Sequence, residues 1–435
     1  MASIKAPGNI YIDPAYTSQE AVNALGGISP ITGEALIFGS TLDDLATGAN
    51  AFAPNGMKKW FTVEGTTVFA ADGCTMYVSN YTFDNESFYG NGTYGLYFIG
   101  SSANYLYGLP KAAGTYDLEN GINITVENSL IHYTLAPGAL LGSIAINGDV
   151  NVQINGSTIG ALVIGGGTSY QQYGTINGDI TFSVTDTAVT GGGFHIHSGK
   201  LFNSENADEL AVVSGTVSNV TVYSSFSGIH TVSDNANRTV SADYDVVISG
   251  SSFGDEINIG YFSNLDDWTG SYVLTVAGST AASIRGNGDA AGLPDVEHFD
   301  LVIGASGTRT VTGVIDRFKT ITIDAGAKVQ ADSISGATLV NLSQGAEVSV
   351  GQITGIGMLS ITGDYTAGNN TIISGLGSFS VSNIAAVRLN GTEIEYGYMP
   401  GQYNFVGDKL VLVTRTLTDV YLNSTYTAAT TGTSY

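Results

Sequence analysis

A regular spacing of short apolar runs constrains the fold of this 435-residue chain more than any other feature of its sequence. In the last third, alternating apolar runs end at Ile303, Ile323, Leu342, Ile361 and Val381, with spacings of 20, 19, 19 and 20 residues. Residues i and i+2 of a strand share a face, so each run sends two apolar side chains to one side. A repeat of this length is typical of a solenoid, whose coils bury their apolar faces against one another. The spacing therefore predicts a parallel β-helix of short strands.

The same pattern continues upstream with longer coils. We expect inward-facing side chains at irregular intervals of 26 to 38 residues, at Val126, Ile154, Val184, Val222, Ile248, Val276 and Ile303. Two coils share their wording, because the motif Ile-Asn-Gly-Asp at residues 146–149 recurs at residues 176–179. The extra residues are expected to form loops, and the loops of a solenoid often gather on its binding face.

The pattern divides the chain into four segments. We expect an N-terminal cap or irregular β region at 1–75, a long-coil β-helix with loops at 76–300, a short-coil β-helix at 301–391, and a hairpin and tail at 392–435. The cap is predicted to contain strands at 9–12 and 34–38, helical turns at 19–25 and 41–46, and a hairpin built from 60–63 and 67–70. Tyr403–Val406 and Lys409–Val413, joined by Gly407-Asp408, predict the C-terminal hairpin.

The charge balance excludes several classes of partner. The chain has 38 acidic and 14 basic residues, a formal net charge of −24. Nucleic-acid binding needs a basic surface that displaces counterions from phosphates, so no nucleic-acid partner is expected. No stretch of 18 or more apolar residues is present, so no membrane insertion is expected. The 58 glycines and 8 prolines fit many short strands joined by turns.

Export and redox chemistry leave few signals. Cys74 is the single cysteine, so no intramolecular disulfide can form, and we expect this residue to be a small buried apolar side chain. Met1 to Lys5 does not open a Sec signal peptide, because no apolar core follows. Earlier removal of a leader and export by another route are both open.

Motifs that suggest catalysis or metal binding are weak. Gly250-Ser251-Ser252-Phe253-Gly254 has the letters of a nucleophile elbow, but no helix pattern follows it, so a coil turn is expected. His195 and His197 share a face if they lie in a strand, with only Glu205 and Asp208 as nearby further ligands. The aspartate pairs Asp43-Asp44 and Asp266-Asp267 are expected to be loop carboxylates. We expect no catalytic residue and no cofactor, with loop-bound Ca²⁺ at Asp255, Glu256 and Asp289 as the alternative.

Aromatic residues cluster at two places and are the candidate contact residues. Residues 77–107 interleave tyrosines with asparagine and glycine, and the C-terminal hairpin adds two more aromatics. Such side chains either stack along the coil, form a protein interface or bind a glycan. The candidates for assembly or ligand contact are Tyr77, Tyr81, Tyr89, Tyr94, Tyr97, Tyr105, Tyr107, Tyr403 and Phe405.

The wording of the coils resembles bacterial β-strand-repeat surface proteins. It is carried by the repeated Ile-Asn-Gly-Asp motif, by Ile321-Thr322-Ile323-Asp324-Ala325-Gly326-Ala327 and by Leu359-Ser360-Ile361-Thr362-Gly363, and it covers residues 120–391. These proteins share a right-handed β-helix with autotransporter passengers and large adhesins. The resemblance implies an all-β, right-handed parallel β-helix outside a bacterial cell or on its surface. It carries over no catalytic residue.

Three functions follow from these observations. The first is a structural protein without catalytic activity, either a filament subunit or a surface adhesin, which associates with itself through open strand edges at the two coil ends. The second is a β-helix polysaccharide lyase or glycosidase with Asp266 and Asp267 in a lateral groove. The third is a module that binds a host or surface glycan through exposed tyrosines.

Overall fold

The chain folds as an all-β parallel solenoid, as its apolar spacing predicted. The computed structural model describes residues 3–55, 57, 59–83, 86–89, 95–109, 114–118, 120–138, 144–165, 174–197, 199–202, 210–229, 240–260, 268–287, 297–365 and 370–414. Contacts divide the chain into two units, which are described separately. Unit 1 comprises Met1–Leu274 and Asn287–His298, and unit 2 comprises Thr275–Gly286 and Phe299–Tyr435.

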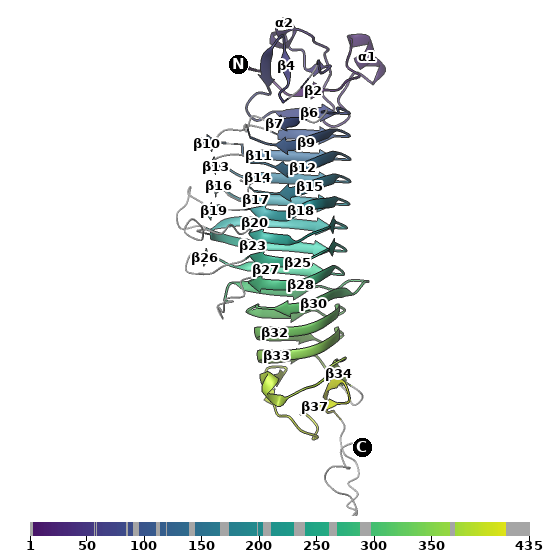
Figure 1. Cartoon of the computed structure of the whole chain (residues 1–435), viewed down its shortest axis with the longest axis vertical. Helices are drawn as coiled ribbons and strands as arrows, with labels where there is room; N and C mark the ends of the chain where they lie inside the picture. The colour runs from purple at the N-terminus through teal and green to yellow at the C-terminus, as the bar shows by residue number, and fades with distance from the viewer. Residues whose placement is uncertain are drawn as a thin grey trace, which may run out of the picture. The chain divides into compact units, whose positions relative to one another are not determined.

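The coils of unit 1 have three sides, each formed by parallel strands stacked one coil above the next (Figure 1). Sheet 1 contains β2 (Ile10–Ile12), β3 (Ala51–Phe52), β6 (Thr75–Ser79), β8 (Gly95–Ile99), β11 (Ile122–Glu127), β14 (Val150–Asn155), β17 (Ile180–Thr185), β20 (Ala211–Ser218) and most of β23 (Val240–Ser249).

Sheet 2 contains β7 (Ser87–Tyr89), β9 (Ser102–Tyr107), β12 (Leu130–Ala136), β15 (Thr158–Val163), β18 (Ala188–His197), β21 (Thr221–Val222), β22 (Phe226–Ile229), β24 (Ser252–Phe253) and β25 (Glu256–Gly260). Sheet 3 contains β10 (Gly114–Asp117), β13 (Ile144–Asn147), β16 (Gly174–Asn177), β19 (Gly199–Phe202), the start of β23 and β26 (Trp268–Thr269). The chain continues through β27 (Tyr272–Ala277) and β28 (Thr280–Asn287).

The register of sheet 1 confirms part of the predicted inward column. Val126 pairs with Ile154, and Ile154 pairs with Val184, all of them buried. Val222 was assigned wrongly: Val184 pairs with Val217, whereas Val222 pairs with Val189 in sheet 2. This coil contains two apolar alternations only a few residues apart, so periodicity alone does not say which sheet each one joins.

The corner between sheets 1 and 2 is built in the same way in seven successive coils. Its first residue has a φ between 47° and 59°, which is the left-handed region that glycine, asparagine and aspartate tolerate best. These residues are Asn80, Gly100, Asn128, Gly156, Asp186, Asn219 and Gly250. The next residue is a buried serine or threonine in five of the coils, at Ser101, Ser129, Ser157, Thr187 and Ser251.

The buried hydroxyls join each coil to the next. The N–H of Ser101 donates to Ser129 Oγ over 3.1 Å, and the N–H of Ser129 donates to Ser157 Oγ over 3.1 Å. Ser129 Oγ in turn donates to the carbonyl oxygen of Glu127 over 2.7 Å. Each hydroxyl therefore satisfies a buried backbone N–H that the tight corner turns away from the regular ladder.

We expect Ser129→Ala to lower the free energy of unfolding by about 1–3 kcal/mol, because the buried N–H of Ser101 loses its acceptor. Ser129→Thr is the matched control, since Thr187 occupies the equivalent corner of a later coil and donates to the carbonyl oxygen of Thr185. The measurement is the denaturant midpoint of each variant. An alanine variant as stable as the threonine variant would show that the hydroxyl chain contributes nothing.

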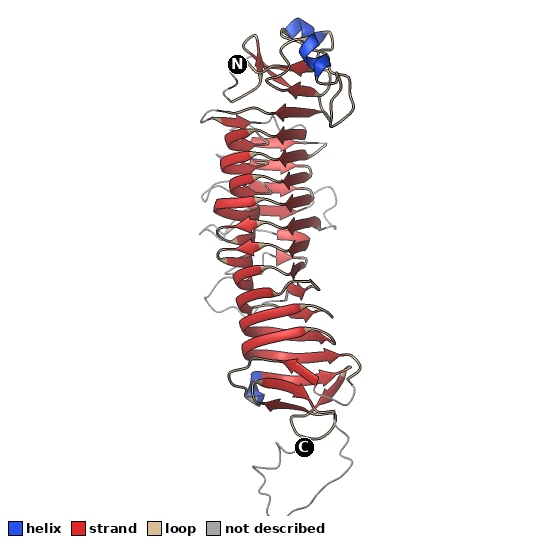
Figure 2. Cartoon of the chain, turned by 90° about the vertical axis from the view of Figure 1, so that its right-hand side faces the viewer, coloured by secondary structure: helices blue, strands red, loops and turns tan. Residues whose placement is uncertain are grey.

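The coils of unit 2 are shorter, and their strands are longer. The strands are β29 (Phe299–Ile303), β30 (Thr310–Asp316), β31 (Thr320–Ile323), β32 (Lys328–Ser343), β33 (Glu347–Thr362) and β35 (Ile384–Leu389). β32 and β33 each contribute to two sides of a coil and pair along almost their whole length (Figure 2).

The predicted column of unit 2 is confirmed at four positions and wrong at the fifth. Ile303, Ile323, Leu342 and Ile361 pair in succession and are buried. Ile361 then pairs with Leu389, whereas Val381 lies in an exposed 3₁₀ turn (Val381–Asn383). The last coil is longer because it includes β34 (Asn370–Ile373), which leaves the parallel stack to pair antiparallel with β38 (Lys409–Leu412).

Both ends of the chain carry small additional elements. In unit 1, β4 (Thr62–Val63) and β5 (Thr66–Phe69) form the predicted hairpin, and β1 (Ser3–Lys5) pairs with β5. The helical turns α1 (Gln19–Ala24) and α2 (Leu42–Ala46) are confirmed, but residues 34–38 form only isolated bridges. In unit 2, β37 (Tyr403–Val406) and β38 form the predicted hairpin, and β36 (Thr392–Ile394) folds back onto β35.

Candidate functional site

A ladder of tyrosines follows the outer side of sheet 1 where the coils begin. Tyr11 pairs with Tyr77, and Tyr77 pairs with Tyr97. The rings of Tyr11 and Tyr77 are stacked, with centroids 4.7 Å apart, and those of Tyr77 and Tyr97 are 5.5 Å apart. Tyr97 donates to Glu127 Oε1 over 2.5 Å. Val22 of α1 and Leu36 pack against Tyr11 and Tyr77, so the upper part of the ladder is a small second core.

The candidate aromatic residues therefore differ in their surroundings. Tyr77, Tyr107 and Tyr403 are buried, which assigns them to packing within this chain. Tyr81, Tyr97, Tyr105 and Phe405 are half-buried. Tyr94 and the side chain of Tyr89 lie outside the described residues. That any of them contacts a partner stays a prediction.

Burial suppresses the ionisation of several tyrosines. Burial, with a hydrogen bond to Glu34, raises the pKa of Tyr11 to about 12. Tyr244 and Tyr272 are stacked inside unit 1 with centroids 4.6 Å apart, and burial raises the pKa of both above the usual value. In the unfolded chain these groups ionise near pH 10. The stability that they contribute is therefore complete below pH 10 and is lost as the pH rises towards each folded-state pKa.

We expect stability to fall from about pH 10 upwards, because unfolding then releases protons from the buried tyrosines. Phenolate absorbance should show Tyr11 titrating near pH 12 in the folded protein. Replacing Tyr244 and Tyr272 by phenylalanine should flatten the fall in denaturant midpoint between about pH 10 and 12. Equal slopes for the two proteins would contradict the assignment.

The N-terminal end of the coil stack is not an open strand edge, contrary to the prediction. The outermost segment is Leu36–Gly39, which joins β3 through the bridge between Phe38 and Ala51. The N–H of Phe38 donates to Gln19 Oε1 over 2.9 Å, and Gln19 Nε2 donates to the carbonyl oxygen of Leu36 over 3.2 Å. The amide of Gln19 thus occupies the place of a neighbouring peptide group, which blocks strand addition there.

The C-terminal end of the stack in unit 2 is closed as well. β36 pairs antiparallel with β35, and the chain after it returns through a bridge between Tyr396 and Tyr403. β38 is already paired on both sides, with β34 and β37. The hairpin therefore closes this end rather than offering β38 to a neighbouring subunit.

Exposed apolar side chains are concentrated at these two ends. The N-terminal apolar patch consists of Leu25, Ile28, Ile31 and Ile37, which are 58%, 54%, 39% and 51% exposed. The C-terminal apolar patch consists of Tyr396, Tyr398, Met399 and Val406, which are 40%, 63%, 60% and 51% exposed. Clusters of this kind mark interaction sites more often than isolated exposed residues do.

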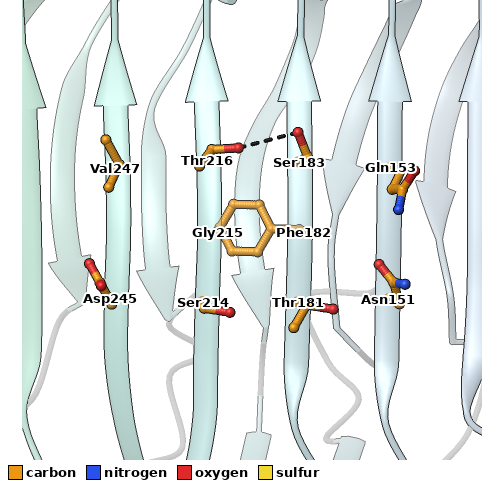
Figure 3. Close-up of a pocket in the computed structure, with 10 residues that line it drawn as sticks. All are labelled: Asn151, Gln153, Thr181, Phe182, Ser183, Ser214, Gly215, Thr216, Asp245 and Val247. Carbon is orange, nitrogen blue, oxygen red and sulfur yellow. Dashed lines mark hydrogen bonds between the residues drawn. The ribbon is translucent and has the colours of Figure 1, made fainter.

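A shallow trough of about 420 Å³ lies on the outer side of sheet 1 (Figure 3). Short side chains on β17 and β20 form its floor, among them Ser183 and Thr216, whose hydroxyls are joined by a hydrogen bond of 3.2 Å. Longer side chains on the flanking strands, such as Gln153 and Asp245, form its sides. Asp245 is the one carboxylate in the lining, so the trough does not provide the carboxylate pair that glycosidases use.

The other sequence candidates take structural roles or fall outside the description. Asp44 closes a capping box with Thr41 at the start of α2. Ser251 is a corner hydroxyl, with strands rather than a helix around it, so the expected coil turn is confirmed. Cys74 is half-buried rather than buried. The residues outside the description are Glu205, Asp208, Asp266, Asp267 and Asp289.

The histidine pair shows no sign of metal binding among the described side chains. His195 Nε2 lies 2.9 Å from the carbonyl oxygen of Gly192, and burial lowers the pKa of its ring. The side chain of His197 is not described. Within the described part of the chain, no group of three or more histidine, cysteine, aspartate or glutamate residues is placed to hold a metal ion.

Sequence reasoning missed two features of these sites. The corner hydroxyls follow an asparagine, aspartate or glycine at intervals of 28 to 33 residues, as in Glu127-Asn128-Ser129, so their spacing was readable. The end caps left no such signal, because Gln19 and Leu36 meet only in the folded chain.

The comparisons with known proteins give no match: no family model matches the chain, and no curated protein or solved structure is significantly similar to it. Among the described residues, no helix is long and apolar enough to cross a membrane.

Proposed function

We propose that this protein is a structural β-solenoid that acts outside a bacterial cell and associates end to end with copies of itself. The observation that carries the proposal is the pair of apolar patches at the two ends of the chain's coils. Over the described residues between the two patches, the large exposed apolar side chains are scattered, at Leu130, Tyr133, Val212, Tyr223 and Val311. The extracellular setting rests on the sequence resemblance alone.

The closed strand edges define the kind of contact. Because Gln19 covers one edge and the hairpin the other, two copies meet through side chains rather than by continuing a sheet. The contact pairs two different patches, so it is heterologous and generates a filament if the rotation between copies does not close. Two N-terminal patches are a poorer pair, since the surrounding cap carries Glu20, Glu34 and Asp43 and would face its own charge.

We expect an aspartate placed in either patch to weaken association at least about tenfold, because a charge in an apolar contact loses its hydration. The variants are Ile28→Asp and Met399→Asp, with Val311→Asp, which also alters an exposed apolar residue, as the control. Sedimentation velocity and negative-stain microscopy over a range of concentrations are the measurements.

Mixing the two variants separates the modes of docking. In the heterologous mode each variant alone is monomeric, while an equimolar mixture forms dimers, because one intact patch of each kind remains. If Met399→Asp alone still dimerises, the N-terminal patches pair with each other and the head-to-tail contact is wrong. Wild-type protein that stays monomeric at high concentration contradicts self-association altogether.

Salt provides a second check. Unit 1 contains 28 of the 38 acidic residues and 6 of the 14 basic residues, so neighbouring copies repel each other. Raising the salt from about 50 mM to about 300 mM shortens the Debye length and should strengthen association several-fold. Weakening by salt would indicate that ion pairs, rather than the apolar patches, hold the copies together.

A further inference from the structure

Two exposed tyrosines lie in one column on the outer side of sheet 2. Tyr133 of β12 is 53% exposed and Tyr223, directly after β21, is 66% exposed. Tyr133 lies opposite Gly160 of β15, which in turn lies opposite residues 190–192 of β18. Tyr223 continues the column, because Val222 pairs with Val189 and the N–H of Tyr223 donates to the carbonyl oxygen of Val189.

A β-bulge displays Tyr133. His132 and Tyr133 together oppose the single residue Asn104 on one side and Gly160 on the other. Such an extra residue turns side chains away from the regular pleat. Tyr105 supports the ring from the preceding coil, with stacked centroids 5.0 Å apart. One face of Tyr133 is therefore covered, and the opposite face is directed along the column towards Tyr223.

The two coils between these tyrosines carry almost no side chains in the column. We call this surface the glycine shelf, formed by Gly160, Ala161, Thr190, Gly191 and Gly192. A Cβ atom at Gly160 would lie 2.4 Å from the carbonyl oxygens of His132 and Tyr133, and one at Gly191 would lie 2.9 Å from that of Gly160. The backbones approach too closely for larger residues, so the shelf is bare.

The dimensions and chemistry of the shelf favour one class of ligand. Three strand spacings of about 4.8 Å separate Tyr133 from Tyr223, which gives about 14 Å between two ring faces. Tyrosine rings stack on the apolar faces of sugar rings, while the peptide groups of bulged glycines and the Thr190 hydroxyl can bond sugar hydroxyls. No shelf residue is charged, so nothing there neutralises an ionic ligand.

We propose that the glycine shelf, with Tyr133 and Tyr223 at its two ends, binds a short neutral oligosaccharide. Unit 1, which carries the shelf, has 28 acidic and 6 basic residues, and its field repels uronate or sulfated glycans. A basic peptide would need a carboxylate on the shelf, and none of its residues supplies one. The site is independent of the end patches, so it does not depend on self-association.

The test measures binding of cellotetraose, maltotetraose and chitotetraose by saturation-transfer NMR and calorimetry, with tetragalacturonate and tetralysine as charged probes. We expect at least one neutral tetrasaccharide to bind, and expect Tyr133→Ala and Tyr223→Ala each to weaken it about 3- to 10-fold, as the loss of one ring contact implies. Tyr133→Phe keeps the stacking ring and should retain the affinity. Thr190→Trp fills the shelf and should abolish binding.

The controls lie elsewhere on the protein. Gln153→Ala alters the trough of sheet 1, and Tyr398→Ala removes a tyrosine of similar exposure from unit 2. Both should bind as the wild type does, with unchanged melting temperatures for all variants. The proposal is overturned if none of the neutral tetrasaccharides binds at millimolar concentration, if a charged probe binds better than every neutral one, or if Gln153→Ala rather than the tyrosine variants removes binding.

Discussion

The stacking of one coil on the next, through backbone hydrogen bonds in a fixed register, is the interaction on which the whole structure depends. Because side chains alternate along each strand, a register fixed by the inward column also fixes every outward column. The corner hydroxyls strengthen this register where the chain turns too sharply for the ladder to continue. Ser101, Ser129 and Ser157 each belong to a different coil, yet they form one chain of hydrogen bonds. The outer surface is thus a regular array whose content changes from coil to coil.

That regularity explains how one fold offers different surfaces. On sheet 1 the same outward column holds Tyr97, then Gln153 and Thr216 on later coils. Where aromatic rings come together they stack and collect the N-terminal cap over them, and where short hydroxyls come together they leave the trough. On sheet 2, bulges interrupt the column and leave glycines between Tyr133 and Tyr223. Each proposed contact surface therefore follows from side-chain size along a column.

The ends obey a different constraint. A parallel stack must stop somewhere, and an unprotected last strand would pair with any other edge. In unit 1 a single side chain, Gln19, occupies the free edge, and in unit 2 an antiparallel hairpin does so. Both solutions satisfy the backbone but leave Ile28, Ile37 and Met399 exposed. Protection against uncontrolled strand pairing and a specific apolar contact are compatible in this arrangement.

The sequence by itself determined the β-solenoid, the hairpin at residues 403–412 and most inward positions, because alternation and period are local properties that any reader of the chain can measure. It did not determine which of two nearby apolar runs enters which sheet, as Val222 shows, or that β34 would leave the stack and displace Val381. Only the tertiary structure decided those points, together with the closure of the ends and the column shared by Tyr133 and Tyr223. Each of these depends on residues from separate coils meeting in space, and the distance between them along the chain carries no signal of that meeting.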